Sequence, residues 1–190
     1  VMLRKPLEMA GVPLYLNMIN SYEDVLKSVD EFGKLAGKEK EAAAKHAEIE
    51  RDYAELTKDV QKGKGPKVLI IFGAPDSFNM STKMSFSGDL VERLGGINIA
   101  NKAENVKDSS FIPLSMEFVA KENPDVVMLI TMGGSKEILE KLRANMRDNV
   151  IWHDVNAVKN NRVYQLPPSL FTVNPGTHTI DAMKIMKEYM

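Results

Sequence analysis

Two continuously apolar runs in the second half of the chain, at positions 67–72 and 126–131, predict buried strands. Helical and strand signals alternate around them. The predicted helices cover 86–94, 115–122, 133–146 and 177–190, and a further strand covers 162–166. Buried strands that alternate with helices imply an α/β fold, in which a mostly parallel sheet is sandwiched by helices.

The chain up to residue 37 combines a short apolar run with an amphipathic helix. The run 12–16 is typical of a strand. Ser21 or Asn20 can cap a helix that begins near Tyr22 and that Gly37 ends. The apolar positions of this helix recur every three or four residues, at Val25, Val29, Phe32 and Ala36.

A second predicted helix, over 38–61, is almost saturated with charge. Its apolar residues form a narrow stripe at Ile49, Tyr53, Leu56 and Val60. At about 1.5 Å per residue it would be about 35 Å long. Two interpretations are equally compatible with this pattern: a surface helix with a solvated face, or a strut that connects two bodies. The Gly/Pro-rich segment 62–66 that follows is the clearest boundary signal in the chain.

Composition places the chain among ordinary globular proteins. Its 190 residues include 25 Lys and Arg against 26 Asp and Glu, a net charge of −1. Near-zero charge argues against a nucleic-acid surface or a polybasic membrane contact. The lack of cysteine excludes thiol catalysis, Cys-ligated zinc and disulfides. No apolar run approaches the roughly 20 residues of a membrane span, and the N-terminus lacks the features of a signal peptide.

The usual catalytic motifs are absent from the sequence. The three histidines, His46, His153 and His178, lack metal-motif partners, and each is more plausible as a surface or packing residue. There is no G-x-S-x-G elbow, Walker A loop or G-x-G-x-x-G fingerprint, and Pro75 removes a donor where a dinucleotide would need one. The sequence therefore gives no support for a hydrolytic or redox enzyme.

Two segments do have the character of a binding surface. Residues 131–135 follow a buried strand with small side chains, at the edge of the sheet where ligands of α/β proteins gather. Residues 78–86 interleave methionine, aromatic and hydroxyl side chains. Met80 and Met84 could simply fill the core. The alternative is a pocket floor for a large, partly aromatic, partly anionic ligand, with methionine as a soft contact or axial metal ligand.

Five runs in a fixed order resemble a known family. They are S-T-K-M-S-F-S-G-D-L (81–90), L-G-G-I-N-I-A (94–100), P-L-S-M-E (113–117), N-P-D-V-V (123–127) and A-V-K-N-N-R-V-Y (157–164). The family is that of the ABC-importer solute-binding proteins for iron–siderophores, haem and cobalamin, whose two lobes are joined by one long helix. The segment 10–14 also resembles the last strand of that family's N-terminal lobe.

The resemblance implies three parts and a binding function without catalysis. Residues 1–37 would be a remnant of the N-terminal lobe, 38–62 the inter-lobe helix, and 66–190 the C-terminal α/β ligand-binding lobe. The cargo would be haem or a ferric siderophore, with cobalamin third, and no intrinsic cofactor is implied. The implied ligand-binding residues are Met80, Ser81, Thr82, Lys83, Met84, Met132 and Gly133. Met132 stands where the family often has a histidine or another polar residue, so it could be an axial ligand of haem iron.

The resemblance also implies a membrane partner. Glu117 matches a glutamate that docks onto permease arginines in relatives, although a solvated glutamate in a first helical turn is equally plausible. Asn161 replaces a family glycine, and asparagine is the usual substitute where φ is positive. No nucleic-acid partner is expected. The location would be the periplasm or the outer face of the cell membrane, with a lipoprotein anchor in a Gram-positive cell.

The strands that the family has before Leu14 are absent. We therefore expect the chain to be a C-terminal fragment, open to homodimerisation or strand exchange at the cut edge. Two other functions stay open at this point. One is a nucleotide- or phosphate-binding enzyme domain that uses the helix N-terminus after Gly133, Gly134 and Ser135. The other is a structural adaptor built on the charged helix.

Overall fold

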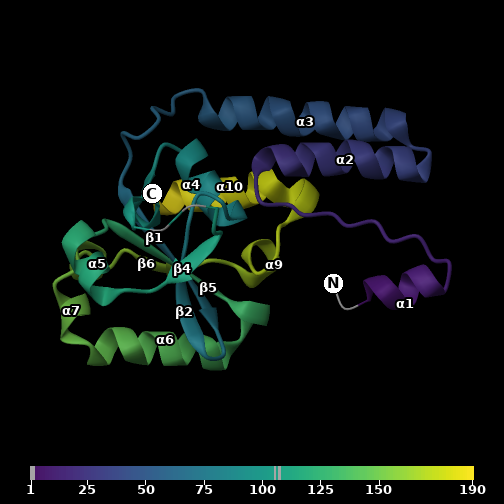
Figure 1. Ribbon diagram of the computed structural model, residues 1–190. Coiled ribbons are helices and arrows are strands. Elements are labelled where there is room, and N and C mark those ends of the chain that lie inside the picture. The colour runs from purple at the N-terminus through teal and green to yellow at the C-terminus, as the bar shows by residue number, and fades with distance from the viewer. Residues whose placement is uncertain (1–2, 105, 107) are drawn as a thin grey trace.

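A six-stranded mixed sheet forms the centre of the computed structural model, which describes residues 3–104, 106 and 108–190 (Figure 1). The strand order is β4-β2-β1-β5-β6, and β3 pairs with the start of β1. The strands are β1 (Lys67–Ala74), β2 (Ser77–Ser81), β3 (Ile97–Asn98), β4 (Phe111–Pro113), β5 (Val126–Thr131) and β6 (Val163–Gln165). The α/β class is confirmed, with the predicted strands at β1, β5 and β6.

The sheet is less parallel than predicted. β1 pairs in parallel with β3 and β5, and β5 with β6, but β2 is antiparallel to both β1 and β4. The turn at Pro75 and Asp76 makes β1 and β2 a hairpin, and no strand was predicted over 77–81. The hairpin escaped prediction because β2 mixes methionine with polar residues and lacks a clean alternation.

Helices cover both faces of the sheet. They are α4 (Phe86–Arg93), α5 (Met116–Glu122), α6 (Lys136–Asp148), α7 (Val150–His153), α8 (Asn156–Lys159), α9 (Pro168–Phe171) and α10 (Thr179–Tyr189), with short 3₁₀ turns η1 (Ile99–Lys102), η2 (Met132–Gly134) and η3 (Gly176–His178). Alternate residues of β1 enter different cores. Val68 and Ile70 pack with α4 and α10, whereas Leu69 and Ile71 pack with α5, α6 and α7. This two-sided burial explains why β1 and β5 are apolar throughout.

The N-terminal part forms α1 (Arg4–Met9) and a helical hairpin of α2 (Tyr22–Ala36) and α3 (Glu39–Thr57) (Figure 1). Ser21 caps α2 by accepting a hydrogen bond from the Asp24 N–H, and Gly37 ends it at φ 66°, as predicted. Helix α3 is shorter than the predicted 38–61. It lies along α2 and α10 and buries Ile49, so at least this part of the charged helix packs on the domain.

The prediction of a strand over 12–16 was wrong. Residues 12–20 are irregular, and Val12, Leu14 and Leu16 are exposed. A strand needs a neighbour for its backbone groups, and the described residues supply none to this segment. The three-part division at 37 and 62 remains a prediction.

Asn161 has φ 55°, so the predicted positive φ is confirmed. The last helix buries Ile180, Met183 and Met186. Ile185 and Met190 are only partly buried, at the edge of the same core. None of the helices that the structure describes has the length and apolar character needed to cross a membrane.

The helical hairpin carries a pH-sensitive contact. His46 Nδ1 on α3 lies 2.9 Å from an Asp30 carboxylate oxygen on α2, and Nε2 lies 3.7 Å from Glu50. The hydrogen bond with Asp30 raises the pKa of His46 above its ordinary value of 6.5. A histidine whose pKa is raised by folding stabilises the folded state fully below its unfolded pKa and loses that contribution as the pH rises through the folded value.

We therefore expect His46 to stabilise the hairpin below pH 6.5 and to lose this effect as the pH rises above 6.5 through its raised pKa. NMR titration of the imidazole, with urea unfolding at several pH values, measures both quantities. His46→Gln should lack the pH-dependent component, whereas the exposed His178→Gln should retain it. An unfolding free energy with the same pH dependence in the wild type and His46→Gln would contradict the prediction.

Candidate functional site

A pocket of about 180 Å³ lies at the carboxyl ends of β1 and β5. This is the edge of a sheet where α/β proteins place ligands. The strands contribute Phe72 and Ile130. The rest of the lining is Ser85, Phe86 and Ser87 at the start of α4, Ser110 and Phe111 at the start of β4, residues 171–174 from the end of α9 onward, and Ile19 and Asn20. No acidic or basic side chain is among these lining residues.

Aromatic rings dominate the pocket wall. The rings of Phe72 and Phe111 lie 5.1 Å apart, centroid to centroid, and Phe86 and Phe171 complete the set. Hydroxyl and amide groups of serine, threonine and asparagine are spaced between them. A flat apolar ligand with a few polar groups fits such a surface.

The loop before α4 is held in one conformation by its own polar groups. The Thr82 hydroxyl donates to the Ser109 carbonyl at 2.6 Å and accepts from the Met84 N–H at 3.1 Å. Ser85 Oγ donates to the Thr82 carbonyl and, as the N-cap of α4, accepts from the Gly88 N–H. This side of the pocket is therefore built before any ligand arrives.

Asn98 anchors the same loop from the core. It is 1% exposed, its Nδ2 donates to the Ser81 carbonyl at 2.9 Å, and its Oδ1 accepts from the Ala100 N–H at 3.1 Å. The sequence marked this residue only as part of the L-G-G-I-N run. A buried asparagine with both amide groups paired gives a physical reason for asparagine at this position of the run.

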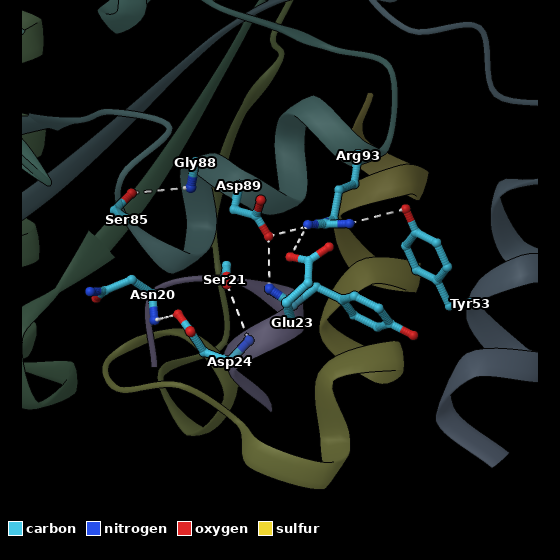
Figure 2. Close-up of polar contacts among 10 residues, drawn as sticks. Asn20, Ser21, Glu23, Asp24, Tyr53, Ser85, Gly88, Asp89 and Arg93 are labelled. Atoms are coloured by element: carbon cyan, nitrogen blue, oxygen red, sulfur yellow. Dashed lines mark hydrogen bonds and ion pairs between the residues drawn. The ribbon is translucent and has the colours of Figure 1, made fainter. Parts of the chain in front are cut away.

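A charged cluster joins the helical hairpin to α4 beside the pocket (Figure 2). The Arg93 guanidinium pairs with Asp89 at 2.7 Å and with Glu23, and it lies over the rings of Tyr22 and Tyr53 at 5.1 and 5.8 Å. Burial lowers the pKa of Arg93, but its hydrogen bonds to Asp89 and Tyr53 outweigh that effect and raise it. Burial is also the main cause that raises the pKa of Tyr22 to about 12.

The same cluster fixes the segment that enters the pocket. Asp89 accepts a hydrogen bond from the Tyr22 N–H at 2.8 Å, and the Asn20 N–H donates to Asp24 at 2.9 Å (Figure 2). Ile19 and Asn20, which line the pocket, directly precede these residues. The position of the hairpin and the shape of the pocket are therefore connected.

Comparison with known proteins identifies the family. The sequence profile described as periplasmic binding protein matches residues 10–170. The chain belongs to the periplasmic binding protein family. The high-affinity heme uptake system protein IsdE of Staphylococcus aureus (strain MRSA252) is 36% identical over 131 residues, which are 69% of this chain and 42% of that protein. The chain thus spans less than half the length of the curated relatives that it matches.

Solved structures of substrate-binding proteins have a similar fold. An ABC transporter substrate-binding protein from Listeria monocytogenes EGD-e superposes with a TM-score of 0.86 at 26% identity, over 100% of this chain and 72% of that one. IsdE of S. aureus in complex with heme superposes with a TM-score of 0.85 at 26% identity, over 98% and 71%.

The structure of this periplasmic binding protein family member divides the predicted site residues into two groups. Met80, Ser81 and Thr82 are at most 1% exposed, so their side chains form core and not cleft surface. Met80 is buried because β2 pairs on both edges and this side chain faces the core under α5 and α6. For Met80, the simpler interpretation of core filling is the correct one.

The remaining predicted residues are accessible near the pocket. Met84 is 42% and Met132 48% exposed, and Lys83 and Gly133 are exposed as well. The Met84 carbonyl accepts from the Ser110 hydroxyl at 2.8 Å, which places it next to a lining residue. The carbonyl before Met132 accepts from the hydroxyl of Thr172, another lining residue, at 3.3 Å. Both methionines therefore flank the pocket.

The structure also shows where Glu117 and the segment Gly133, Gly134 and Ser135 lie. Glu117 is exposed in the first turn of α5. Gly133 and Gly134 have φ of 60° and 68° in η2, and Ser135 caps α6. The described part of the chain contains no cluster of three or more His, Cys, Asp or Glu side chains that could hold a metal ion.

Several lining residues were missed from the sequence. Phe111, Phe171 and Thr172 are far apart in the chain from 72–87, and only the sheet order brings them together. Phe72 is the last residue of a predicted buried strand, and ligands of α/β proteins bind at such strand ends. The sequence nevertheless did not distinguish it from the other apolar residues of β1.

Gly88 should be indispensable for the shape of this site. A Cβ on Gly88 would lie 1.9 Å from the Thr82 carbonyl oxygen, which is backbone and part of the fixed loop. We expect Gly88→Ala to lower the free energy of unfolding by about 3 kcal/mol, measured by urea denaturation. Ser87→Ala is the matched control, because its hydroxyl has no partner among the described residues. Equal stability of the two variants would contradict this account of the turn.

Arg93 should stabilise the joint between the hairpin and α4. We expect Arg93→Met to cost about 2 kcal/mol in unfolding free energy, because it leaves Asp89 and Glu23 without their cation and removes the stacking on two tyrosines. Arg143→Met is the control, since its ion pair with Glu140 is exposed and should contribute less than about 0.5 kcal/mol. Similar losses of unfolding free energy in both variants would contradict the expectation that the contacts of Arg93 stabilise the protein more than an exposed ion pair does.

Proposed function

We propose that this chain belongs to an extracytoplasmic binding protein of an ABC importer, and that it supplies one wall of the site for an iron complex, with haem as the foremost cargo. The observation that carries the proposal is the phenylalanine-lined pocket at the carboxyl ends of β1 and β5, in a chain 36% identical to a heme uptake protein over 131 residues. Ferric siderophores rank next, followed by cobalamin.

The contact surface that we propose consists of the pocket wall and its accessible flanks. Lys83, Met84, Met132 and Gly133 remain in it, and the buried Met80, Ser81 and Thr82 are withdrawn. Met132 is our candidate for an axial ligand, because its exposed thioether stands at the end of β5 beside the pocket and thioethers ligate haem iron. The aromatic rings would stack against the macrocycle.

Delivery to a membrane permease is the second half of the proposal. We place Glu117 at the permease surface, since it is exposed on α5 and carries the charge that a basic partner would recognise. Lipoprotein anchoring and dimerisation remain predictions of the sequence alone. A nucleotide-binding function at Gly133, Gly134 and Ser135 is not favoured by any observation here.

Haem binding tests the proposal directly. We expect titration of the chain with haem to shift the Soret band, and Met132→Ala to move that band again and to weaken binding about tenfold through loss of an iron–sulfur bond. Met9→Ala, on α1 and 86% exposed, is the matched control and should leave the spectrum unchanged. A ferric trihydroxamate, followed by fluorescence quenching, tests the second cargo.

The outcomes separate the parts of the proposal. A Soret shift that is identical in the wild type and Met132→Ala would remove Met132 as an iron ligand but leave haem binding in place. Failure of haem, ferric trihydroxamate and cobalamin to bind would overturn the proposed function.

A further inference from the structure

Helix α1 has an apolar side that no other described element covers. Residues three and four apart lie on the same side of a helix, and here they are Leu3, Pro6, Leu7 and Ala10. No residue of α1 is buried, and the helix lies apart from the other elements (Figure 1). Isolated helices shorter than about 12 residues are marginal in water, and α1 has six. A helix this short needs a surface to pack against.

The helical hairpin carries an open apolar groove. The groove has a volume of about 580 Å³ and lies between α2, the start of α3 and the chain at η3. Its apolar lining comes from Ile19, Val25, Val29, Phe32, Ala36 and Ala42. Phe32 is 49% exposed there. Grooves of this kind bind the apolar side of an amphipathic helix, whose side chains three and four residues apart enter the groove together.

The charges at the rim of the groove complement those of α1. Lys38 and Glu41 line the groove where α3 begins, both are exposed, and neither forms an ion pair with another described residue. Helix α1 also carries one cation and one anion, Arg4 and Glu8, whose mutual ion pair is exposed and contributes little to stability. In both places the two charges are about one helical turn apart. Arg4 can therefore face Glu41 while Glu8 faces Lys38.

The segment that carries α1 leaves the groove of its own chain and does not follow it. Asn17 borders the groove, but none of the described residues before it does. The Tyr15 hydroxyl donates to Glu31, which lies about 100° around α2 from the groove residue Phe32. This contact directs the preceding residues past the rim, and Figure 1 shows α1 apart from the hairpin. The groove of another copy is open to α1 without this constraint.

We propose that two copies of this chain exchange their N-terminal arms, residues 3–14, so that α1 of each copy lies in the groove of the other. Leu3 and Leu7 enter the groove and pack on Val29 and Phe32. The exchange is reciprocal, so it closes at two copies related by a two-fold axis. This contact differs from the strand-edge exchange expected from the sequence, and it does not depend on the cargo proposed above.

Sedimentation equilibrium of the full chain makes the first test. We expect a dimer with twice the chain mass of 21.2 kDa. Leu7→Lys on the arm and Phe32→Lys in the groove should each weaken the dimer about thirtyfold, because each places a charge in the apolar contact. Met9→Lys and Leu35→Lys are the matched controls, since these residues are exposed on the same two helices but lie outside the contact. A monomer at every concentration, or a dimer that Leu7→Lys and Phe32→Lys leave intact, overturns the proposal.

Cross-linking makes the second test and identifies whose groove the arm occupies. The sequence has no cysteine, so a variant with both Leu7→Cys and Phe32→Cys forms disulfides only through these two positions. We expect mild oxidation to give a covalent dimer in which position 7 of one copy is joined to position 32 of the other, as peptide mapping would show. The control pairs Met9→Cys with Phe32→Cys and should cross-link far less. A 7–32 disulfide within one chain would place the arm in its own groove, and that result or the absence of a 7–32 disulfide overturns the exchange.

Discussion

The parallel pairing of β1 with β5 is the constraint on which the rest of the molecule depends. Six residues of each strand are in register, from Val68 with Val126 to Gly73 with Thr131. Both strands are buried on both faces, so each face requires its own layer of helices. The same register brings the ends of the two strands to one edge of the sheet. The pocket begins there, with Phe72 and Ile130.

The pocket is also tied to the helical hairpin by one charged side chain. Asp89 holds Arg93 and the Tyr22 N–H at once, so α4 and the first residue of α2 meet at a single carboxylate. Around Arg93, two tyrosine rings exclude water and strengthen the ion pairs. The helical hairpin and one side of the pocket therefore share the same polar contacts.

The sequence predicted elements well where local signals agreed with burial. β1 and β5 were evident because they are apolar throughout. The structure shows that α4, α5 and α6, which were also predicted, each begin after a capping serine: Ser85, Ser115 and Ser135. It failed at 12–16 and at β2. An apolar run becomes a strand only if a partner strand lies beside it, and pairing is a non-local property.

The candidate site residues also fall into those that the sequence could predict and those that it could not. The sequence by itself determined the fold class and the family, because these depend on short motifs and on apolar periodicity. It could not tell that Met80 is core while Met84 is surface, since burial depends on which elements lie on each side of a strand. Only the tertiary structure decided that Phe111 and Phe171 line the same pocket as Phe72. Contacts between distant segments arise from packing of the whole chain, and no local pattern encodes them.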